Sequence, residues 1–421
     1  MGLFWINIGK AWGVIKNEGI GRGGKRVFSY FFRLFQRVRS GDVLIVTCGV
    51  GDSARYRAHH VAEELNIHGI KTSVTHQDNP FLARYANRFS IFIFHRTLFT
   101  PRVERFFMRA KSLGKEIIFE TDDLVYDPQY IRKTAYFEKM NVLERKLYEK
   151  GVGIEILSDP TVKVCTTSTA YLGDKLTELG KQVYIVPNKL SKQDMEWIGK
   201  IRKTWNMEHG TGEGNGTRNM GQGTNGEIQN TKYAIQDTVY VGYFSGTASH
   251  DEDFATITGP LLAILEARPI VMLVIAGPLV LDDAFEPFHD RIIRLSFAGR
   301  FEHFENISAI DINLAPLVMN DPFCESKSEL KFFEAGAFGI PTVAAATGVF
   351  REAILDGEDG FVASTPGEWK EKILRLIDDE RLRKQMGECA ATKVSDKYTT
   401  ENAKNEEYYQ YLKLTIDRLT S

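Results

Sequence analysis

The chain has 421 residues, which is long for a single hydrophobic core, so two domains of roughly 150 to 200 residues each are expected. A formal net charge of −2 gives no overall attraction to nucleic acid, and none is expected as a partner. The four cysteines lie far apart, which excludes a four-cysteine zinc site and indicates a reducing compartment, with the cytoplasm as the default. They are Cys48, Cys165, Cys324 and Cys389.

Residues 1–40 are basic and aromatic, with eight Lys/Arg against one acid, Glu18. No long apolar core with a cleavage site follows the first residues, so a secretory signal is not expected. Basic residues interleaved with aromatic ones are typical of contact with a membrane surface, which would place the protein on the inner face of the plasma membrane. Equally, "SYFFRLFQRV" fits an amphipathic helix packed on the rest of the protein.

A first α/β series begins with the apolar strand "DVLIVTCGVG" at Asp42, followed by a helical pattern that Gly69 ends. The stretches "KTSVTH", "SIFIFHR", "KEIIFETDD", "VKVCTTS" and "QVYIVPN" then read as short buried strands. Strands that alternate with helices predict a parallel, doubly wound sheet. We expect this first domain to span residues 41–190.

A second series runs from "TVYVGYFSG" at Thr238 to "GFVAS" and predicts a second such domain over residues 238–395. Between the two lies a linker, residues 191–237, which includes a glycine-rich insertion, "GTGEGNGTRNMGQGTNG". The longest apolar run, "IVMLVIAGPLVL", is too short and too interrupted to span a bilayer, so no transmembrane helix is expected.

The segment after "GFVAS" is strongly helical, and its first helix has an apolar face expected to cover the second sheet: Trp369, Ile373, Leu376 and Ile377. Residues 396–421 are expected to form a C-terminal helix that either stays on the second domain or crosses back to the first.

Ligands of parallel α/β sheets bind at the carboxyl ends of the strands. In the second domain, "VGYFSGTASHDEDF" places Ser245, Gly246 and Thr247 directly after a strand, where backbone amides can approach a phosphate. An ordinary tight turn would have the same composition.

The stretch "KSELKFFEAGAFGIPTVAA" predicts a helix that begins near Ser328. The free amides of Leu330 and Lys331, with the charges of Lys327 and Lys331, would suit a diphosphate. Glu334 would then lie within reach of a ribose, whose vicinal hydroxyls a carboxylate binds well. The alternative for Glu334 is a helix salt bridge with Lys331 or Lys327.

"SELKFFEAGAFGIPTVAAATGVFREAILDGEDGFV" resembles the nucleotide-sugar signature of family 4 glycosyltransferases of the GT-B fold. "RYRAHHVAEEL", "FETDDLVYD", "CTTSTAYLGDKLTELGKQVYIVPN" and "YFSGTASHDEDF" resemble, in the same order, blocks of bacterial polysaccharide and rhamnosyl-type transferases, so the likeness covers residues 42–365. The resemblance implies an α/β protein with two Rossmann-like doubly wound domains facing a cleft. It further implies retaining transfer of a sugar from a nucleoside diphosphate donor to a growing glycan or lipid-linked acceptor in cell-surface polysaccharide synthesis, without a cofactor or metal.

By that resemblance Glu334 matches the second glutamate of the family's Glu-x7-Glu pair and would bind the ribose. The first glutamate falls at Ser326, a departure, and Glu325 stands one position early. The family's Arg and Lys that clamp the diphosphate are missing from "YFSGTASHDEDF". The amides of Gly246 and Thr247 must then carry more of the binding, with His250, Lys327 or Lys331 as the cation; His250 could equally cap the helix that follows.

In the first domain the resemblance assigns Gly49, Gly51 and Arg55 to the acceptor and the donor phosphate. His95, at a strand end, and Asp122, in "ETDDLVYD", are the candidate catalytic residues, although a strand-end histidine often has a structural role. The acids of "ETDDLVYD" would also suit a metal, but the tandem α/β organisation favours the GT-B fold; they would orient an acceptor hydroxyl or cap the next helix. Arg57 could pair with Glu63 or Glu64.

Two other functions fit the same sequence. One is a sugar-phosphate synthase or phosphorylase on this fold. The other is a catalytically silent GT-B scaffold at the membrane, which the serine at position 326 would favour.

Overall fold

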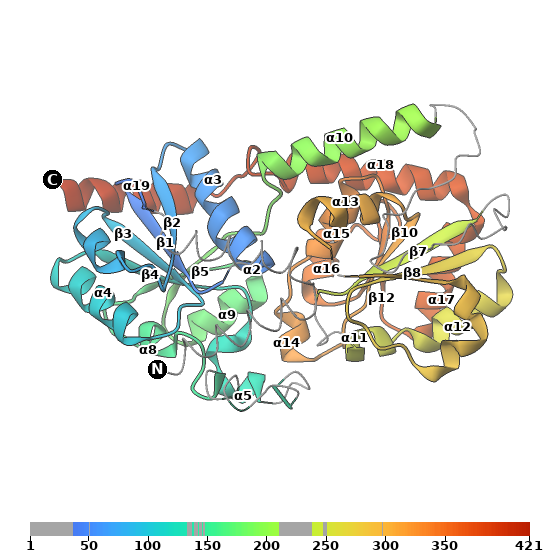
Figure 1. The fold of residues 1–421 in the computed structure, drawn as a ribbon, viewed down its shortest axis with the longest axis horizontal. Helices are drawn as coiled ribbons and strands as arrows, with labels where there is room; N and C mark the ends of the chain where they lie inside the picture. Colours follow the sequence, from blue (N-terminus) through green and yellow to red (C-terminus); the bar gives the residue numbers. More distant parts are fainter. Residues whose placement is uncertain are drawn as a thin grey trace, which may run out of the picture. The chain divides into compact units, whose positions relative to one another are not determined.

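The structure is a computed structural model that describes residues 37–49, 51–132, 137–138, 142, 145, 148–209, 238–246, 251–296 and 298–421. It divides into two compact units: unit 1 includes the chain up to Lys189 and Ala403–Ser421, and unit 2 is Leu190–Asn402 (Figure 1). The glycine-rich insertion, Thr247, His250 and residues 1–36 of the basic aromatic segment lie outside the described residues.

Unit 1 contains a six-stranded sheet in which every described pairing is parallel, in the order β2-β1-β3-β4-β5-β6. Its strands are β1 (Val43–Thr47), β2 (Thr72–His76), β3 (Ile91–His95), β4 (Glu116–Thr121), β5 (Val164–Thr167) and β6 (Gln182–Ile185). Its helical segments are α2 (Asp52–Ala54), η1 (Arg55–His60), α3 (Val61–Ile67), η2 (Leu82–Asn87), α4 (Pro101–Ser112), η3 (Leu124–Tyr126), α5 (Pro128–Ile131), α8 (Ile154–Leu157), α9 (Ala170–Glu178) and α19 (Glu406–Thr420).

Both faces of this sheet are buried, which is why its strands read as continuous apolar runs. Alternate residues point to opposite faces. Ile91 and Ile93 of β3 join a core cluster that includes residues of α3 and α19. Phe92 and Phe94 point the other way and pack on Phe106 of α4, with ring centroids 4.9 and 5.8 Å apart.

Unit 2 contains a second parallel six-stranded sheet in the order β12-β11-β10-β7-β8-β9. Its strands are β7 (Val239–Phe244), β8 (Val271–Ala276), β9 (Ile292–Leu295), β10 (Ile312–Ala315), β11 (Thr342–Ala345) and β12 (Phe361–Ala363). Its helical segments are α10 (Lys192–His209), α11 (Asp251–Ala255), α12 (Thr258–Ala267), η5 (Asp283–Arg291), α13 (Arg300–Ser308), α14 (Pro322–Glu325), α15 (Leu330–Gly336), α16 (Gly348–Ala353), α17 (Pro366–Asp378) and α18 (Glu380–Lys397).

These sheets confirm the prediction of two Rossmann-like doubly wound domains. The apolar face of the first C-terminal helix is confirmed as well, since α17 buries the four residues named from the sequence against the second sheet: Trp369, Ile373, Leu376 and Ile377. α19, in contrast, packs on unit 1, where Tyr408, Tyr409 and Leu412 join the core cluster.

The strand order locates the ligand side of each unit. The order reverses between β1 and β3 in unit 1 and between β7 and β10 in unit 2. At such a switch point the loops after neighbouring strands leave toward opposite faces, and this opens a crevice at the carboxyl ends of the strands.

Candidate active-site residues at the two switch points

In unit 2, the loops after β7 and β8 lie next to the switch point between β7 and β10. Gly246 is exposed, two residues after β7, and no atom lies within 4 Å of where its Cβ would stand. Gly277 follows β8 with a φ of +91°, and a Cβ there would lie 2.0 Å from the Ser245 oxygen. Only glycine allows the two loops to approach this closely. Gly277 was not recognised from the sequence, although "IAGPL" places a glycine directly after a strand.

Lys331 reaches across this switch point. It lies in α15, after β10, and its Nζ donates a hydrogen bond to the Phe244 carbonyl at the end of β7. The ammonium also lies 5.0 Å from the centroid of the Tyr243 ring. Burial lowers the pKa of Lys331 to about 8, against the opposing effect of the Asp253 and Glu334 carboxylates. The lysine therefore holds a positive charge at neutral pH beside the strand end at which a ligand phosphate would bind.

Glu334 is buried and is held by two residues of α13. Arg300 Nη1 donates to Glu334 Oε1, and His303 Nε2 lies 3.1 Å from Glu334 Oε2. Arg300 is held in turn by Asp194 of α10, with Nε to Oδ1 at 3.2 Å. Glu334 thus forms its ion pairs with Arg300 and His303. The predicted alternative, a helix salt bridge with Lys331 or Lys327, is not the pairing found.

α15 is also shorter than its sequence indicated. The helix begins at Leu330 rather than near Ser328, and Glu329 at its N-cap makes no side-chain cap hydrogen bond. Lys327 therefore lies before the helix, where its Nζ stands 4.7 Å from the centroid of the Phe323 ring. The amides of Leu330 and Lys331 lie in the first turn, as the prediction required.

The two residues at the expected first glutamate point to different partners. Ser326 is fully buried, and its hydroxyl donates to the Phe323 carbonyl. Glu325 is partly exposed, and its Oε2 accepts a hydrogen bond of 3.0 Å from the Gly348 amide. Of the two residues, Glu325 is thus the one with a carboxylate, and that carboxylate contacts Gly348, the first residue of α16.

In unit 1 a chain of hydrogen bonds crosses the switch point. Thr47 Oγ1, at the end of β1, is 2.9 Å from His95 Nδ1, at the end of β3. His95 Nε2 is 3.1 Å from Ser53 Oγ, which donates to Asp122 Oδ2 at 2.7 Å. Because Ser53 donates its one hydroxyl proton to Asp122, its oxygen accepts from His95 Nε2, so a neutral imidazole in this chain carries its proton on Nε2 and accepts from Thr47 at Nδ1.

The structure therefore brings the two candidate catalytic residues together through Ser53. His95 is buried, whereas Ser53 is partly exposed at the start of α2. Ser53 was not recognised from the sequence, because a serine that opens a helix is common.

Asp122 is also paired with Arg96, whose Nε lies 2.6 Å from Asp122 Oδ1. Burial acts to raise the pKa of Asp122, but Arg96, His95 and Ser53 outweigh it and hold that pKa well below its usual range. Arg96 adopts a φ of +46°, a left-handed conformation that is uncommon outside glycine. Backbone strain of this kind is often found at functional sites.

Two other acids of "ETDDLVYD", Asp123 and Asp127, act as caps. Asp123 accepts from the Val125 amide at 3.0 Å, and Asp127 accepts from the Gln129 amide at 2.8 Å. No group of three or more His, Cys, Asp or Glu side chains suited to a metal occurs in the part of the chain that the structure describes.

The remaining predicted residues of unit 1 lie after β1. Gly49 and Gly51 flank the β1–α2 turn, and Arg55, in the first turn of the helix, forms an exposed ion pair with Asp52. Arg57 is fully buried and pairs with Glu120, with Nε to Oε1 at 2.8 Å. The expected pairing of Arg57 with Glu63 or Glu64 was wrong, because the side chain turns inward to β4 rather than along its own helix.

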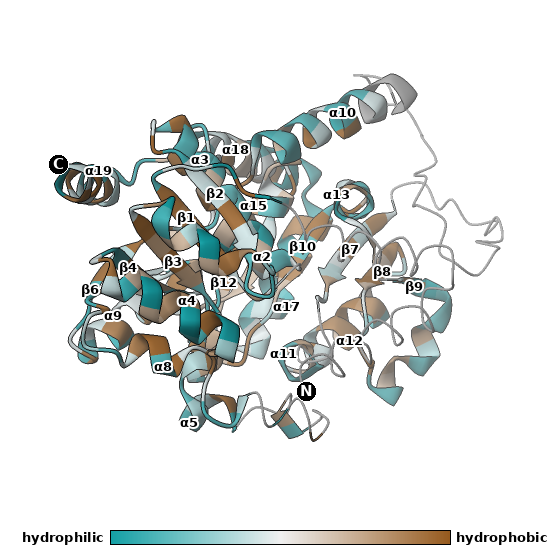
Figure 2. Ribbon diagram, turned by 60° about the vertical axis from the view of Figure 1, so that its left-hand side comes forward, coloured by the Kyte–Doolittle hydropathy of each residue, from teal (hydrophilic) through white to brown (hydrophobic). Residues whose placement is uncertain are grey.

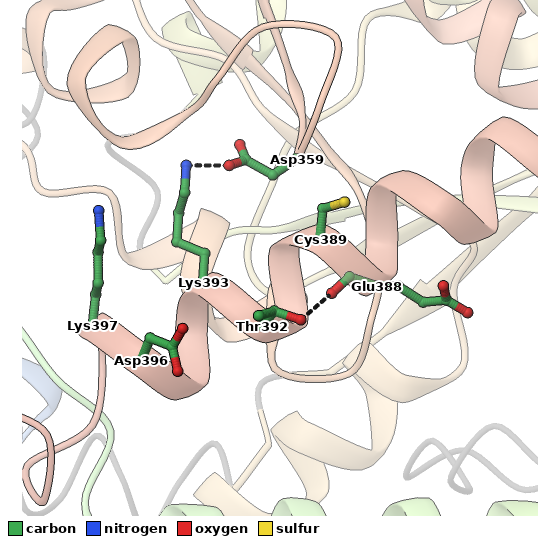
Figure 3. A pocket seen from close by; sticks show the side chains of 7 residues that line it. All are labelled: Asp359, Glu388, Cys389, Thr392, Lys393, Asp396 and Lys397. Carbon is green, nitrogen blue, oxygen red and sulfur yellow. Dashed lines mark hydrogen bonds and ion pairs between the residues drawn. The ribbon is translucent and has the colours of Figure 1, made fainter.

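A surface pocket of about 410 Å³ lies on α18, and none of the predicted site residues lines it (Figure 3). Lys393 on its wall is paired with Asp359 and donates to the Ala353 carbonyl at 2.9 Å. The charge of Lys393 is thus neutralised by Asp359.

Among the described helices, none is long and apolar enough to cross a membrane.

Residues 239–379, most of unit 2, match the family model described as "Glycosyl transferases group 1". None of the curated proteins matches the chain in sequence. Solved structures match its fold: Anabaena HepE in complex with UDP and glucose (TM-score 0.53, 13% identity, 89% of this chain and 100% of that one) and sucrose-phosphate synthase from Thermosynechococcus elongatus (TM-score 0.54, 11% identity, 90% and 98%). WaaG, a glycosyltransferase involved in lipopolysaccharide biosynthesis, matches with a TM-score of 0.53 and 12% identity over 88% and 99% of the two chains.

The fold and the family match define the class of this protein. Its two parallel sheets are those of GT-B glycosyltransferases, and unit 2 carries the group 1 glycosyltransferase domain. The chain therefore has the GT-B fold, with a glycosyltransferase domain in residues 239–379, as its sequence predicted.

Proposed function

We propose that the protein is a retaining glycosyltransferase that moves a sugar from a nucleoside diphosphate donor to a growing glycan or lipid-linked acceptor in cell-surface polysaccharide synthesis. The binding of a nucleoside diphosphate donor is inferred from the position of Lys331, whose charged group is held at the end of β7 beside Gly246. Structures of similar fold support a nucleotide-sugar donor, since HepE was solved with UDP and with UDP-glucose.

In this proposal Lys331 and the amide of Gly246 bind the diphosphate, with Lys327, Thr247, His250 and the first-turn amide of Leu330 as the further candidates. A cation and backbone amides aimed at the leaving diphosphate stabilise the charge that develops as the glycosidic bond breaks. These groups make a metal unnecessary, so we expect activity to survive a chelator.

Glu334 is proposed to bind the ribose. Each carboxylate oxygen has two lone pairs, and one hydrogen bond from Arg300 or His303 leaves each oxygen able to accept another. Arg300 and His303 then act as positioning residues, because they fix the carboxylate in one orientation.

In unit 1, Gly49, Gly51 and Arg55 are proposed to lie on the acceptor and phosphate side, and His95 and Asp122 to orient the acceptor hydroxyl. In this hydrogen-bonded chain Thr47 and His95 are buried, whereas Ser53 and Asp122 are partly exposed, so an acceptor hydroxyl would contact the chain through Ser53 or Asp122.

The first experiment is a thermal-shift panel of nucleoside diphosphates and their sugars. A ligand that binds only the native state raises the melting temperature by mass action. Glu334→Ala should reduce the shift given by the preferred nucleotide, and Glu305→Ala, on the outer side of α13, serves as the control. An unchanged shift in Glu334→Ala would remove Glu334 from the ribose.

Two other functions are distinguished by a release assay. A catalytically silent scaffold would free no nucleoside diphosphate from any common nucleotide sugar, even with lipid acceptor present. A sugar-phosphate synthase, which the similarity in fold to sucrose-phosphate synthase favours, would accept a small sugar phosphate in place of a glycan or lipid.

The cellular place proposed is the cytoplasm, with peripheral contact to the inner face of the plasma membrane through residues 1–40. Deletion of residues 1–38 should reduce binding to liposomes. If binding is unchanged, that segment has no part in membrane contact.

A further inference from the structure

The outward face of α4 is strongly basic. The helix buries its apolar face against the first sheet through Val103, Phe106, Phe107 and Ala110. Arg102, Arg105 and Arg109 are all exposed on the other face, where a period of 3.6 residues gathers them on one side of the helix. α4 lies at the front of unit 1 in Figure 2, which is coloured by hydropathy.

The neighbouring segment η2 extends this basic face. η2 packs against α4 and adds the exposed Arg84, with Arg88 directly after it. Each guanidinium lies over an aromatic ring of its own segment: Arg84 is 5.5 Å from the centroid of Phe81, and Arg88 is 5.9 Å from that of Tyr85.

These five arginines, which we call the α4–η2 face, keep their charge unneutralised. Within the described part of the chain none of them forms an ion pair with a carboxylate, and the protein hydrogen bonds of Arg102 and Arg105 go to backbone carbonyls. Glu104 is the one acid in the sequence of α4 and η2. Lys111, on the border of the face, is instead paired with Asp159 at 2.7 Å.

Two apolar side chains are exposed beside the arginines. Met108 is 53% exposed, and Leu113, at the end of α4, is 38% exposed. Arginines that surround exposed apolar side chains match a lipid surface, where the cations meet anionic headgroups and the apolar groups enter the boundary with the acyl chains. A polyanionic glycan would pair with the arginines but would offer no apolar surface to Met108 and Leu113.

We propose that the α4–η2 face docks unit 1 on an anionic lipid membrane. Arg37 and Val38, the first described residues, also lie beside this face. Arg37 lies 5.7 Å from the centroid of the Phe81 ring, and the Val38 amide donates to the Tyr85 hydroxyl at 3.2 Å. The basic sequence that precedes Arg37 therefore joins the molecule beside the α4–η2 face. Because α4 follows β3, whose last residue is His95, the docked unit is the one that holds the acceptor candidates.

The test is co-sedimentation of the full chain with vesicles of phosphatidylcholine, with and without 30% phosphatidylglycerol. One variant carries Arg102→Gln, Arg105→Gln and Arg109→Gln. The matched control carries Arg381→Gln, Lys384→Gln and Lys397→Gln, which removes the same charge from exposed positions of α18. Melting temperatures of all three proteins show that each is folded.

The parent chain should bind the anionic vesicles and not the neutral ones, and 0.5 M salt should weaken that binding. The α4 variant should bind at least about tenfold more weakly, since each basic residue near an anionic surface contributes to the affinity. The α18 control should bind like the parent chain, and Met108→Asp should bind more weakly without any change in the number of arginines.

Equal weakening in both triple variants would show an effect of net charge and overturn the proposal. So would an α4 variant that binds like the parent chain, or a parent chain that binds soluble heparin but not anionic vesicles. None of these results depends on sugar transfer, so the proposed enzymatic function would stand even if the membrane proposal failed.

Discussion

Lys331 and Glu334 belong to one short helix but serve different neighbours. Lys331 reaches the end of β7, 87 residues earlier in the chain, and Glu334 is fixed by α13. Both were identified from the sequence as ligand-binding candidates, because small and charged residues alternate in a helical period before Gly-Ile-Pro. Their partners could not be predicted, since Phe244, Arg300 and His303 reach them only through the folding of the sheet.

The shifted pKa of Lys331 gives a test at the residue scale. Its folded pKa of about 8 lies below the ordinary lysine pKa of 10.5, so between those pH values the unfolded chain binds more protons than the folded one. The stability of unit 2 should therefore gain from Lys331 as the pH rises from about 8 toward 10.5. Lys331→Met should lack that gain, which urea unfolding at pH 7 and pH 10 would measure.

Ligand affinity should move in the opposite direction. If Lys331 binds the diphosphate as a cation, the affinity for the preferred nucleoside diphosphate should fall as the pH rises through 8. Lys331→Met should bind weakly at every pH. An affinity that is level from pH 7 to pH 9 in the parent chain would argue against a charged Lys331 in the site.

At the scale of elements, the small residues around α15 make room for another helix. Gly336 faces α18, where an added Cβ would lie 2.9 Å from Val394 and 3.4 Å from Ala390. Gly387 of α18 is tighter still, since a Cβ there would lie 1.9 Å from the Gly339 oxygen. α15, which carries Lys331 and Glu334, is thus packed closely against α18.

Gly387→Ala should force α18 away from α15. We expect a loss of about 2–3 kcal/mol in the free energy of unfolding, because overpacked cores relax poorly. Gly259→Ala is the control, since nothing lies within 4 Å of its Cβ position in α12, and it should be neutral or slightly stabilising. Denaturant unfolding compares the two variants, and equal stabilities would mean that the helices separate at no cost.

At the scale of the whole molecule, the chain completes unit 1 with its last helix. Tyr409 of α19 donates to Glu64 Oε1 at 2.6 Å, a contact between residues 345 positions apart. Glu64 Oε2 also lies 3.2 Å from Lys189 Nζ, at the end of unit 1's first segment. The core of unit 1 is therefore not complete until α19 has been made.

Two leucines of α19 test this arrangement on one helix. Leu412 is fully buried in the core cluster, whereas Leu414 is 71% exposed. Leu412→Ala should cost about 2–5 kcal/mol and Leu414→Ala less than about 0.5 kcal/mol. Limited proteolysis should cut unit 1 first in Leu412→Ala, while the thermal shift given by nucleotide binding to unit 2 persists. Equal stabilities of the two variants would contradict the packing of α19 on unit 1.

The sequence by itself determined the alternation of strands and helices, because strands buried on both faces must be apolar throughout and glycines such as Gly69, with a φ of +80°, end helices locally. It also placed His95, Asp122 and Gly246 at strand ends. These features depend on residues close together in the chain.

Only the tertiary structure decided which of those residues meet. Ser53 joins His95 to Asp122 across 42 and 69 positions, Arg57 turns to Glu120 rather than to its own helix, and Arg300 replaces the lysines as the partner of Glu334. The physical reason is that a charged side chain pairs with the nearest opposite charge in space once it is buried. The order of the strands, which no local pattern specifies, sets those neighbours.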